Sequence, residues 1–118
     1  MDTVEAVANQ LMQHYKKQKD EGWYYSALMQ RIRARIGQNN YTEVRADLDE
    51  LARGEELPER RRLGIHRHWA KQIVKKLNEQ LQQDMNESHR GIAEKLRNDL
   101  NTALQQAGEN RRISWPIN

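Results

Sequence analysis

The side chains best suited to chemistry in this chain of 118 residues are bases gathered in one stretch. Residues 60–76 hold seven bases and no acid, a local charge of +7 that the formal net charge of +3 conceals. They are Arg60, Arg61, Arg62, Arg67, Lys71, Lys75 and Lys76. Cationic side chains neutralise phosphates and release counterions, so local charge decides where a polyanion binds. The stretch predicts contact with a DNA or RNA backbone through Arg60, Arg61, Arg62, Arg67, Lys71 and Lys75.

The helical period separates these bases from the apolar residues of the same segment, which we expect to be a helix over residues 63–85. The apolar stripe consists of Leu63, Trp69, Ile73, Val74, Leu77 and Leu81. With Trp69 at zero and 100° per residue, Arg67, Lys71 and Lys75 lie at about 160°, 200° and 240°. One side of the helix is therefore buried, and the other presents a continuous basic stripe to solvent.

An acidic stretch just before the bases offers a different interpretation. Residues 43–59 hold seven acids and two arginines, a local charge of −5. The acids are Glu43, Asp47, Asp49, Glu50, Glu55, Glu56 and Glu59. If this stretch lies against the basic stripe, within one molecule or across a dimer, the charges cancel and no polyanion binds. Both alternatives stay open. The helix after Asn40 would expose Asp47 with its neighbouring acids and repel DNA, which argues against a helix-turn-helix.

The four histidines suggest little chemistry of their own. His66 and His68 are neighbours, but without cysteine or a clear carboxylate set we expect no metal and no cofactor. The Arg-x4-His spacing of Arg61 and His66 occurs also in the HEPN family of helical ribonucleases, where histidine would act as general acid or base. Among 13 arginines such a spacing arises by chance, so it gives a third alternative and not a family assignment.

The C-terminal residues 109–118 carry Ile113, Trp115 and Ile117 without a helical period. Trp115 either docks on its own domain or inserts into a partner as an anchor. The second possibility predicts a protein-binding adaptor or inhibitor, acting through Trp115 or through the exposed face of the last helix.

Periodic apolar residues predict the elements that position these groups. In the first helix, Val4, Val7, Ala8, Leu11, Met12 and Tyr15 form one expected buried stripe. Further helices follow over residues 23–36 and from Tyr41 to Gly54. After the 63–85 helix, apolar residues thin out before a last helix capped by Ser88 and ended by Gly108. We expect an antiparallel hairpin there; one rod of about 40 residues, about 60 Å long, is the alternative.

These elements predict an all-α protein, a small bundle of four to five helices with a longer C-terminal helical hairpin. Residues 1–108 would form a single domain and 109–118 a tail. Only 36% of residues are hydrophobic, so we expect a homodimer that completes a lean core. No apolar run could span a membrane, and the absence of cysteine and of a secretory signal indicates the cytoplasm. The favoured function is a small non-enzymatic nucleic-acid-binding or regulatory protein.

Overall fold

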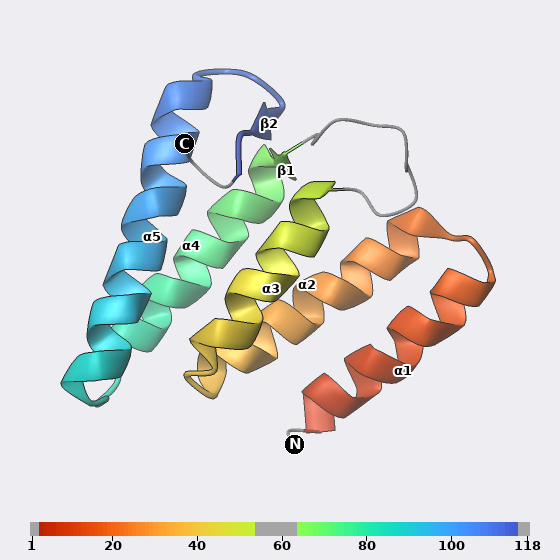
Figure 1. Ribbon diagram of the computed structural model, residues 1–118, viewed down its shortest axis with the longest axis horizontal. Coiled ribbons are helices and arrows are strands. Elements are labelled where there is room, and N and C mark those ends of the chain that lie inside the picture. The colour runs from red at the N-terminus through yellow and green to blue at the C-terminus, as the bar shows by residue number, and fades with distance from the viewer. Residues whose placement is uncertain (1–2, 54–63, 116–118) are drawn as a thin grey trace.

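The computed structural model describes residues 3–53 and 64–115 (Figure 1). The helices in these ranges are α1 (Thr3–Lys17), α2 (Glu21–Gly37), α3 (Tyr41–Arg53), α4 (Arg67–Leu81) and α5 (Glu87–Ala107). Two short strands, β1 (Ile65–His66) and β2 (Arg112–Ile113), pair antiparallel. The predicted all-α class is confirmed, although the strands were not predicted. No helix within the described ranges is long and apolar enough to cross a membrane.

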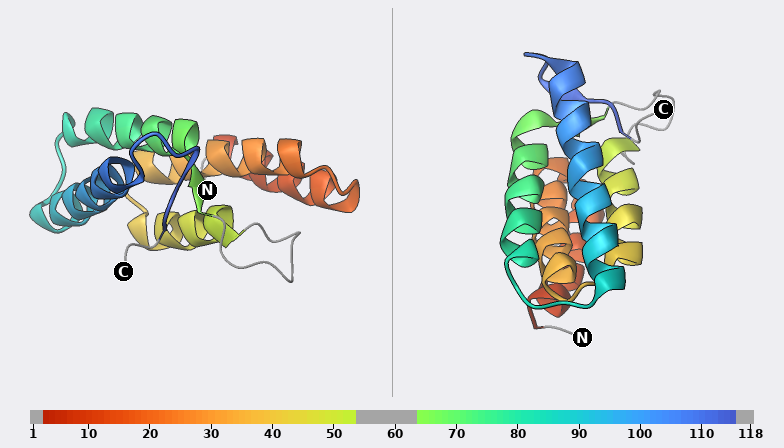
Figure 2. Two further views of the ribbon diagram at one scale, coloured as in Figure 1. Left: turned by 90° about the horizontal axis from the view of Figure 1, so that it is seen from above. Right: turned by 90° about the vertical axis from the view of Figure 1, so that its left-hand side faces the viewer.

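Helix α2 is the central element. Its C-terminal half lies between α3 and α4, as the view from above shows (Figure 2), and α1 packs along it from the Tyr15–Trp23 stack to the Glu5–Arg35 ion pair. Leu28, Ile32 and Ile36 recur every four residues and have no exposed surface, because neighbouring helices cover this side of α2. The helix predicted over residues 23–36 is therefore confirmed.

Helices α4 and α5 form the predicted antiparallel hairpin (Figure 1). The chain turns at residues 82–86, where Met85 is the only large apolar side chain. Asn86, not the predicted Ser88, caps α5, with its side chain accepting a hydrogen bond from the His89 amide at 2.7 Å. Arg90 holds the turn by donating to the Leu81 and Gln83 carbonyls at 3.0 and 3.1 Å. The continuous-rod alternative is wrong because capping side chains satisfy both helix ends at this break.

The prediction for α1 was wrong in part. Val4, Val7 and Leu11 are 51%, 48% and 39% exposed, whereas the sequence placed them in the buried stripe. Among the described elements α1 packs only against α2, and one neighbouring helix covers a narrow stripe. Ala8 and Met12 fill that stripe, and the remaining apolar side chains face outward.

The C-terminal segment joins the core at Ile113 and at Trp115, the last residue that the structure describes. Ile65 of β1 pairs with Ile113 of β2, and both are buried. Gly64 precedes this pair at φ +84°, and a Cβ there would lie 2.0 Å from the Ile113 carbonyl oxygen, so only glycine fits. Trp115 is 3% exposed and packs in the same cluster. Of the two alternatives for Trp115, the structure shows docking on its own domain, which contradicts its assignment as an exposed anchor.

Candidate nucleic-acid interface

Helix α4 presents the predicted basic stripe to solvent. Ala70, Ile73 and Leu77 are completely buried, which fixes the orientation of the helix. Lys71 and Lys75 consequently lie on the exposed side, and Arg67 is half-buried at its border. From residue 64 to residue 78 the described chain holds four bases and no acid.

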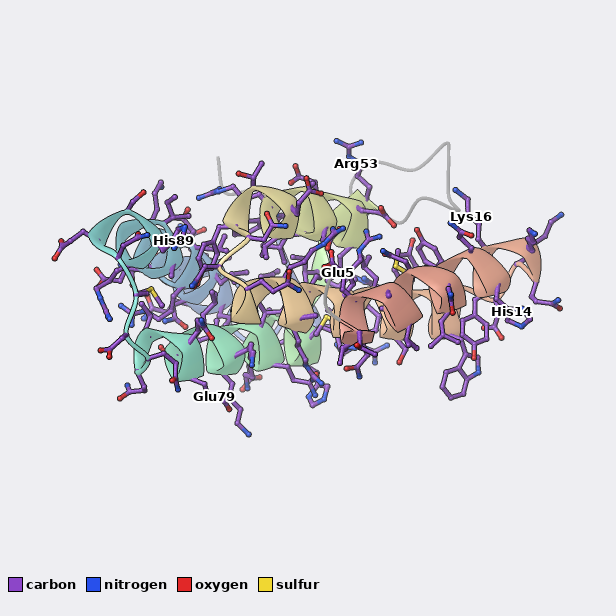
Figure 3. All side chains as sticks on the ribbon, turned by 90° about the horizontal axis from the view of Figure 1, so that it is seen from below. Glu5, His14, Lys16, Arg53, Glu79 and His89 are labelled. Atoms are coloured by element: carbon purple, nitrogen blue, oxygen red, sulfur yellow. The ribbon has the colours of Figure 1, made fainter. Side chains whose placement is uncertain are left out.

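A groove between α2 and α4 widens the positive surface. The shallow depression, about 340 Å³ in volume, is lined by Arg33, Gln72, Lys75, Lys76 and Glu79. The Gln72 side-chain oxygen accepts a hydrogen bond from Arg33 Nη2 at 2.5 Å, and the Gln72 amide nitrogen lies 2.8 Å from His68 Nε2. Gln72 thus orients a guanidinium of α2 beside the lysines of α4. Glu79 points outward from the same helix (Figure 3) and is the one acid lining the groove.

Two arginines beyond the predicted set, Arg111 and Arg112, lie at the first turn of α4. The strand pair brings them there, since the Arg67 amide donates to the Arg111 carbonyl at 2.8 Å and Arg112 pairs in register with His66. Arg112 Nη1 also donates to the Gly64 carbonyl at 3.4 Å. The side chains of Arg111 and Arg112 are both exposed. Sequence reasoning missed this contribution because it depends on the tail folding back. The alternation of exposed Arg112 and Ser114 with buried Ile113 and Trp115 was the available signal.

We call the combined surface the basic face. It consists of Arg33, Arg67, Lys71, Lys75, Lys76, Arg111 and Arg112. Arg60, Arg61 and Arg62, which were predicted to lead into it, fall outside the described residues.

The described acids of α3 do not cover the basic face, because no Cα atom of α3 lies within 8 Å of a Cα atom of α4. They pair with α2 instead. Asp47 accepts from Arg31 Nη2 at 2.6 Å and from Arg35 Nη1 at 2.9 Å. Its 2% exposure contradicts the prediction that this acid faces solvent. The masking alternative is therefore excluded for residues 43–53, and residues 54–59 lie outside the described part.

The same network holds two arginines of α2 within the fold, because α1 pairs with them as well. Arg35 Nε donates to Glu5 Oε2 at 2.7 Å, and Arg31 Nη1 donates to the Asn9 side chain at 2.9 Å. The hydrogen bond from Arg35 lowers the pKa of Glu5, which burial opposes and the Gln38 side chain reinforces. Glu5 lies near the middle of the molecule, where α1 and α2 meet (Figure 3).

His66 has a structural role at the start of α4. Its Nδ1 accepts a hydrogen bond from the His68 amide at 3.3 Å and so caps the helix. Burial lowers the pKa of His66, and the charges of Arg112, Arg111 and His68 lower it further. The ribonuclease alternative needs Arg61 beside this ring, and Arg61 lies outside the described residues.

No group of three possible metal ligands occurs in the part of the chain that the structure describes. His14 and His89 lie at opposite ends of the molecule (Figure 3).

The fold and this surface define an all-α protein with one acid-poor, cationic side. Comparison with protein families, with curated proteins and with solved structures found no significant match.

Proposed function

We propose that this chain is a small non-enzymatic protein that binds the sugar–phosphate backbone of a nucleic acid through its basic face. The observation that carries the proposal is the unneutralised charge of α4. Neither Lys71 nor Lys75 forms a hydrogen bond or an ion pair with the described residues. A phosphate backbone would supply the missing negative charge, and its counterions would be released on binding.

The layout of the bases suits a backbone more than a single anion. Arg67 and Lys75 lie eight residues apart on α4, about 12 Å at 1.5 Å per residue, so the stripe covers several phosphate spacings. Arg33 extends the positive surface across the groove, and Arg111 extends it beyond the start of the helix. Long flexible lysines act as point charges, which favours binding without strict sequence preference.

The salt dependence of binding tests this proposal. If about five of the seven bases contact phosphates, log Kd against log salt for random duplex DNA should have a slope of about 4 to 5, and for a single strand about 3.5. Fluorescence anisotropy with labelled duplex DNA, single-stranded DNA and RNA would measure it. No detectable binding of any of the three at about 50 mM salt contradicts the proposal.

Paired substitutions locate the site. Lys71→Gln together with Lys75→Gln should lower the salt slope by about 2 and weaken binding to all three probes alike. The matched control is Lys17→Gln with Lys95→Gln, which removes two exposed charges elsewhere on the molecule. Equal weakening in both double variants would mean that net charge, and not this face, determines binding.

The protein-binding alternative through Trp115 lacks the feature it needs. An anchor must enter a pocket on the partner, and this indole already fills its own core at 3% exposure. The exposed face of α5 offers one large apolar side chain, Ile92 at 40% exposure. The hairpin of α1 and α2, on the opposite side of the molecule from α5 (Figure 1), exposes more large apolar side chains and is the better candidate for a protein contact.

A further inference from the structure

The hairpin of α1 and α2 exposes most of the large apolar side chains found at the surface. Five large hydrophobic residues among those described are exposed, and four of them lie on this hairpin. We call these four, Val4, Val7, Leu11 and Trp23, the apolar strip. Clustered exposed apolar residues mark interaction sites in soluble proteins, whereas scattered ones need no explanation.

The strip is continuous along one side of the hairpin. With Ala8 at zero on the α1 wheel, Val4 and Leu11 lie at about −40° and −60°, on the same side of the α2 contact. Tyr15 continues the row one turn beyond Leu11, and the Trp23 ring stacks on it at 6.0 Å between centroids and 25° between planes. Stacking and the Asp20 cap on the Trp23 amide hold the exposed indole in place.

The charges around the strip favour a second copy as its occupant. The described residues that border the row on its solvent side are Thr3, Gln10, His14 and Gln18, with no lysine, arginine or acid among them. A membrane-binding helix has cations along this border, and a charged partner would need opposite charges there. A neutral border lets a surface meet its own copy without repulsion.

The spacing of the row also suits two-fold symmetry. Val7 lies three residues after Val4 and four before Leu11, so a two-fold axis beside Val7 places Val4 of each copy against Leu11 of the other. An antiparallel arrangement keeps the lysines of the last turn, Lys16 and Lys17, at opposite ends of the dimer. A parallel arrangement would bring four of these lysines together.

We propose that two copies of this chain pair antiparallel through the apolar strip, with Val7 near the symmetry axis. The proposal specifies a surface for the expected homodimer and does not rest on nucleic-acid binding. In such a dimer each α1 packs between its own α2 and the α1 of the partner copy. The partner's α1 then covers the apolar strip, which the chain's own α2 leaves exposed.

Cross-linking tests the geometry cleanly, because the chain has no cysteine of its own. Val7→Cys should form a covalent dimer under mild oxidation with oxidised glutathione, since residues at a two-fold axis approach within disulfide range. Gln13→Cys is the matched control, exposed on the same helix but far from the strip. Equal cross-linking of both variants would overturn the proposal.

Mixing two variants tests the direction of pairing. Chains carrying Val4→Cys and Leu11→Cys should cross-link to each other in preference to themselves, because the antiparallel arrangement pairs these positions. Preferential joining of like variants would show a parallel dimer and overturn the antiparallel arrangement.

Mass measurement in solution tests the association itself. Sedimentation equilibrium of the unmodified chain should show a dimer with a dissociation constant at or below the order of 10 µM, and Val7→Glu should weaken it at least tenfold. Gln13→Glu adds the same charge off the strip and should leave the dimer intact. Because Val7 is half-exposed, we expect the Val7→Glu chain to fold, and circular dichroism would check this. A monomer at about 100 µM, or equal loss in both variants, contradicts the proposal.

Discussion

The arginines of α2 and the lysines of α4 look alike in sequence, but the structure uses them in opposite ways. Arg31 and Arg35 are each less than one-fifth exposed and pair with Asp47. Lys71 and Lys75 are exposed and pair with nothing that the structure describes. The difference follows from the neighbouring helix, because Asp47 of α3 pairs with α2, whereas no Cα atom of α3 lies within 8 Å of a Cα atom of α4. A base stabilises the fold where an acid meets it, and stays exposed to solvent where none does.

The test with the largest expected effect replaces Asp47, the acid that pairs with both Arg31 and Arg35. Asp47→Ala should lower the free energy of unfolding by about 3–5 kcal/mol, because two guanidinium groups lose a buried carboxylate. Urea unfolding followed by circular dichroism would measure the loss. Asp49→Ala, at a half-buried acid of the same helix, should cost far less. Similar losses at both positions would show that the pairing of Asp47 with two arginines adds no stability beyond that of a half-buried acid.

A second test acts on the other acid of this network. Glu5→Gln should lower the free energy of unfolding by about 1.5–3 kcal/mol at pH 7, because it weakens a charged hydrogen bond with Arg35. The folded pKa of Glu5 lies below its ordinary value of 4.5, so this stabilisation is present above pH 4.5 and is lost as pH falls through the folded pKa. Unfolding of both chains at pH 7 and near pH 3 would show the gap closing. A gap independent of pH would contradict the charge-based explanation.

A smaller effect is expected at the start of α4. The folded pKa of His66 is lowered, so its neutral form stabilises the fold above pH 6.5, and this contribution is lost as pH falls through the folded pKa. Protonated Nδ1 can no longer accept from the His68 amide, and a lost cap costs about 1 kcal/mol. His66→Asn keeps a capping oxygen without the titration. Unfolding from pH 7.5 to pH 5 should therefore destabilise the unmodified chain more than the variant; parallel curves would contradict this.

Local pattern was enough to predict the helices and the exposure of Lys71 and Lys75. The spacing of Ile73 and Leu77 fixes which side of α4 is buried, whatever covers it. The same reasoning failed for Val7, because a wheel shows where apolar residues gather but not how many neighbours cover them.

The remaining errors concern contacts between distant segments. Burial of Asp47 depends on Arg31, 16 residues earlier, and on how α2 and α3 cross. The position of Arg111 beside Arg67 depends on a strand pair whose paired residues are 46 and 48 positions apart in sequence. Single-helix periodicity carries no information about either contact. The basic face was therefore predicted in its centre and missed at its edges.

The smallest expected effect completes the comparison. Lys71→Gln and Lys75→Gln, separately or together, should change the free energy of unfolding by no more than about 0.5 kcal/mol, since both side chains are exposed and neither forms a hydrogen bond or an ion pair with the described residues. Unfolding in low and high salt would detect a slight gain from relieved repulsion, strongest in low salt. A loss above about 1 kcal/mol would show that these lysines serve the fold as Arg31 and Arg35 do. If stability holds while nucleic-acid affinity falls, the charge of α4 serves binding and that of α2 serves folding.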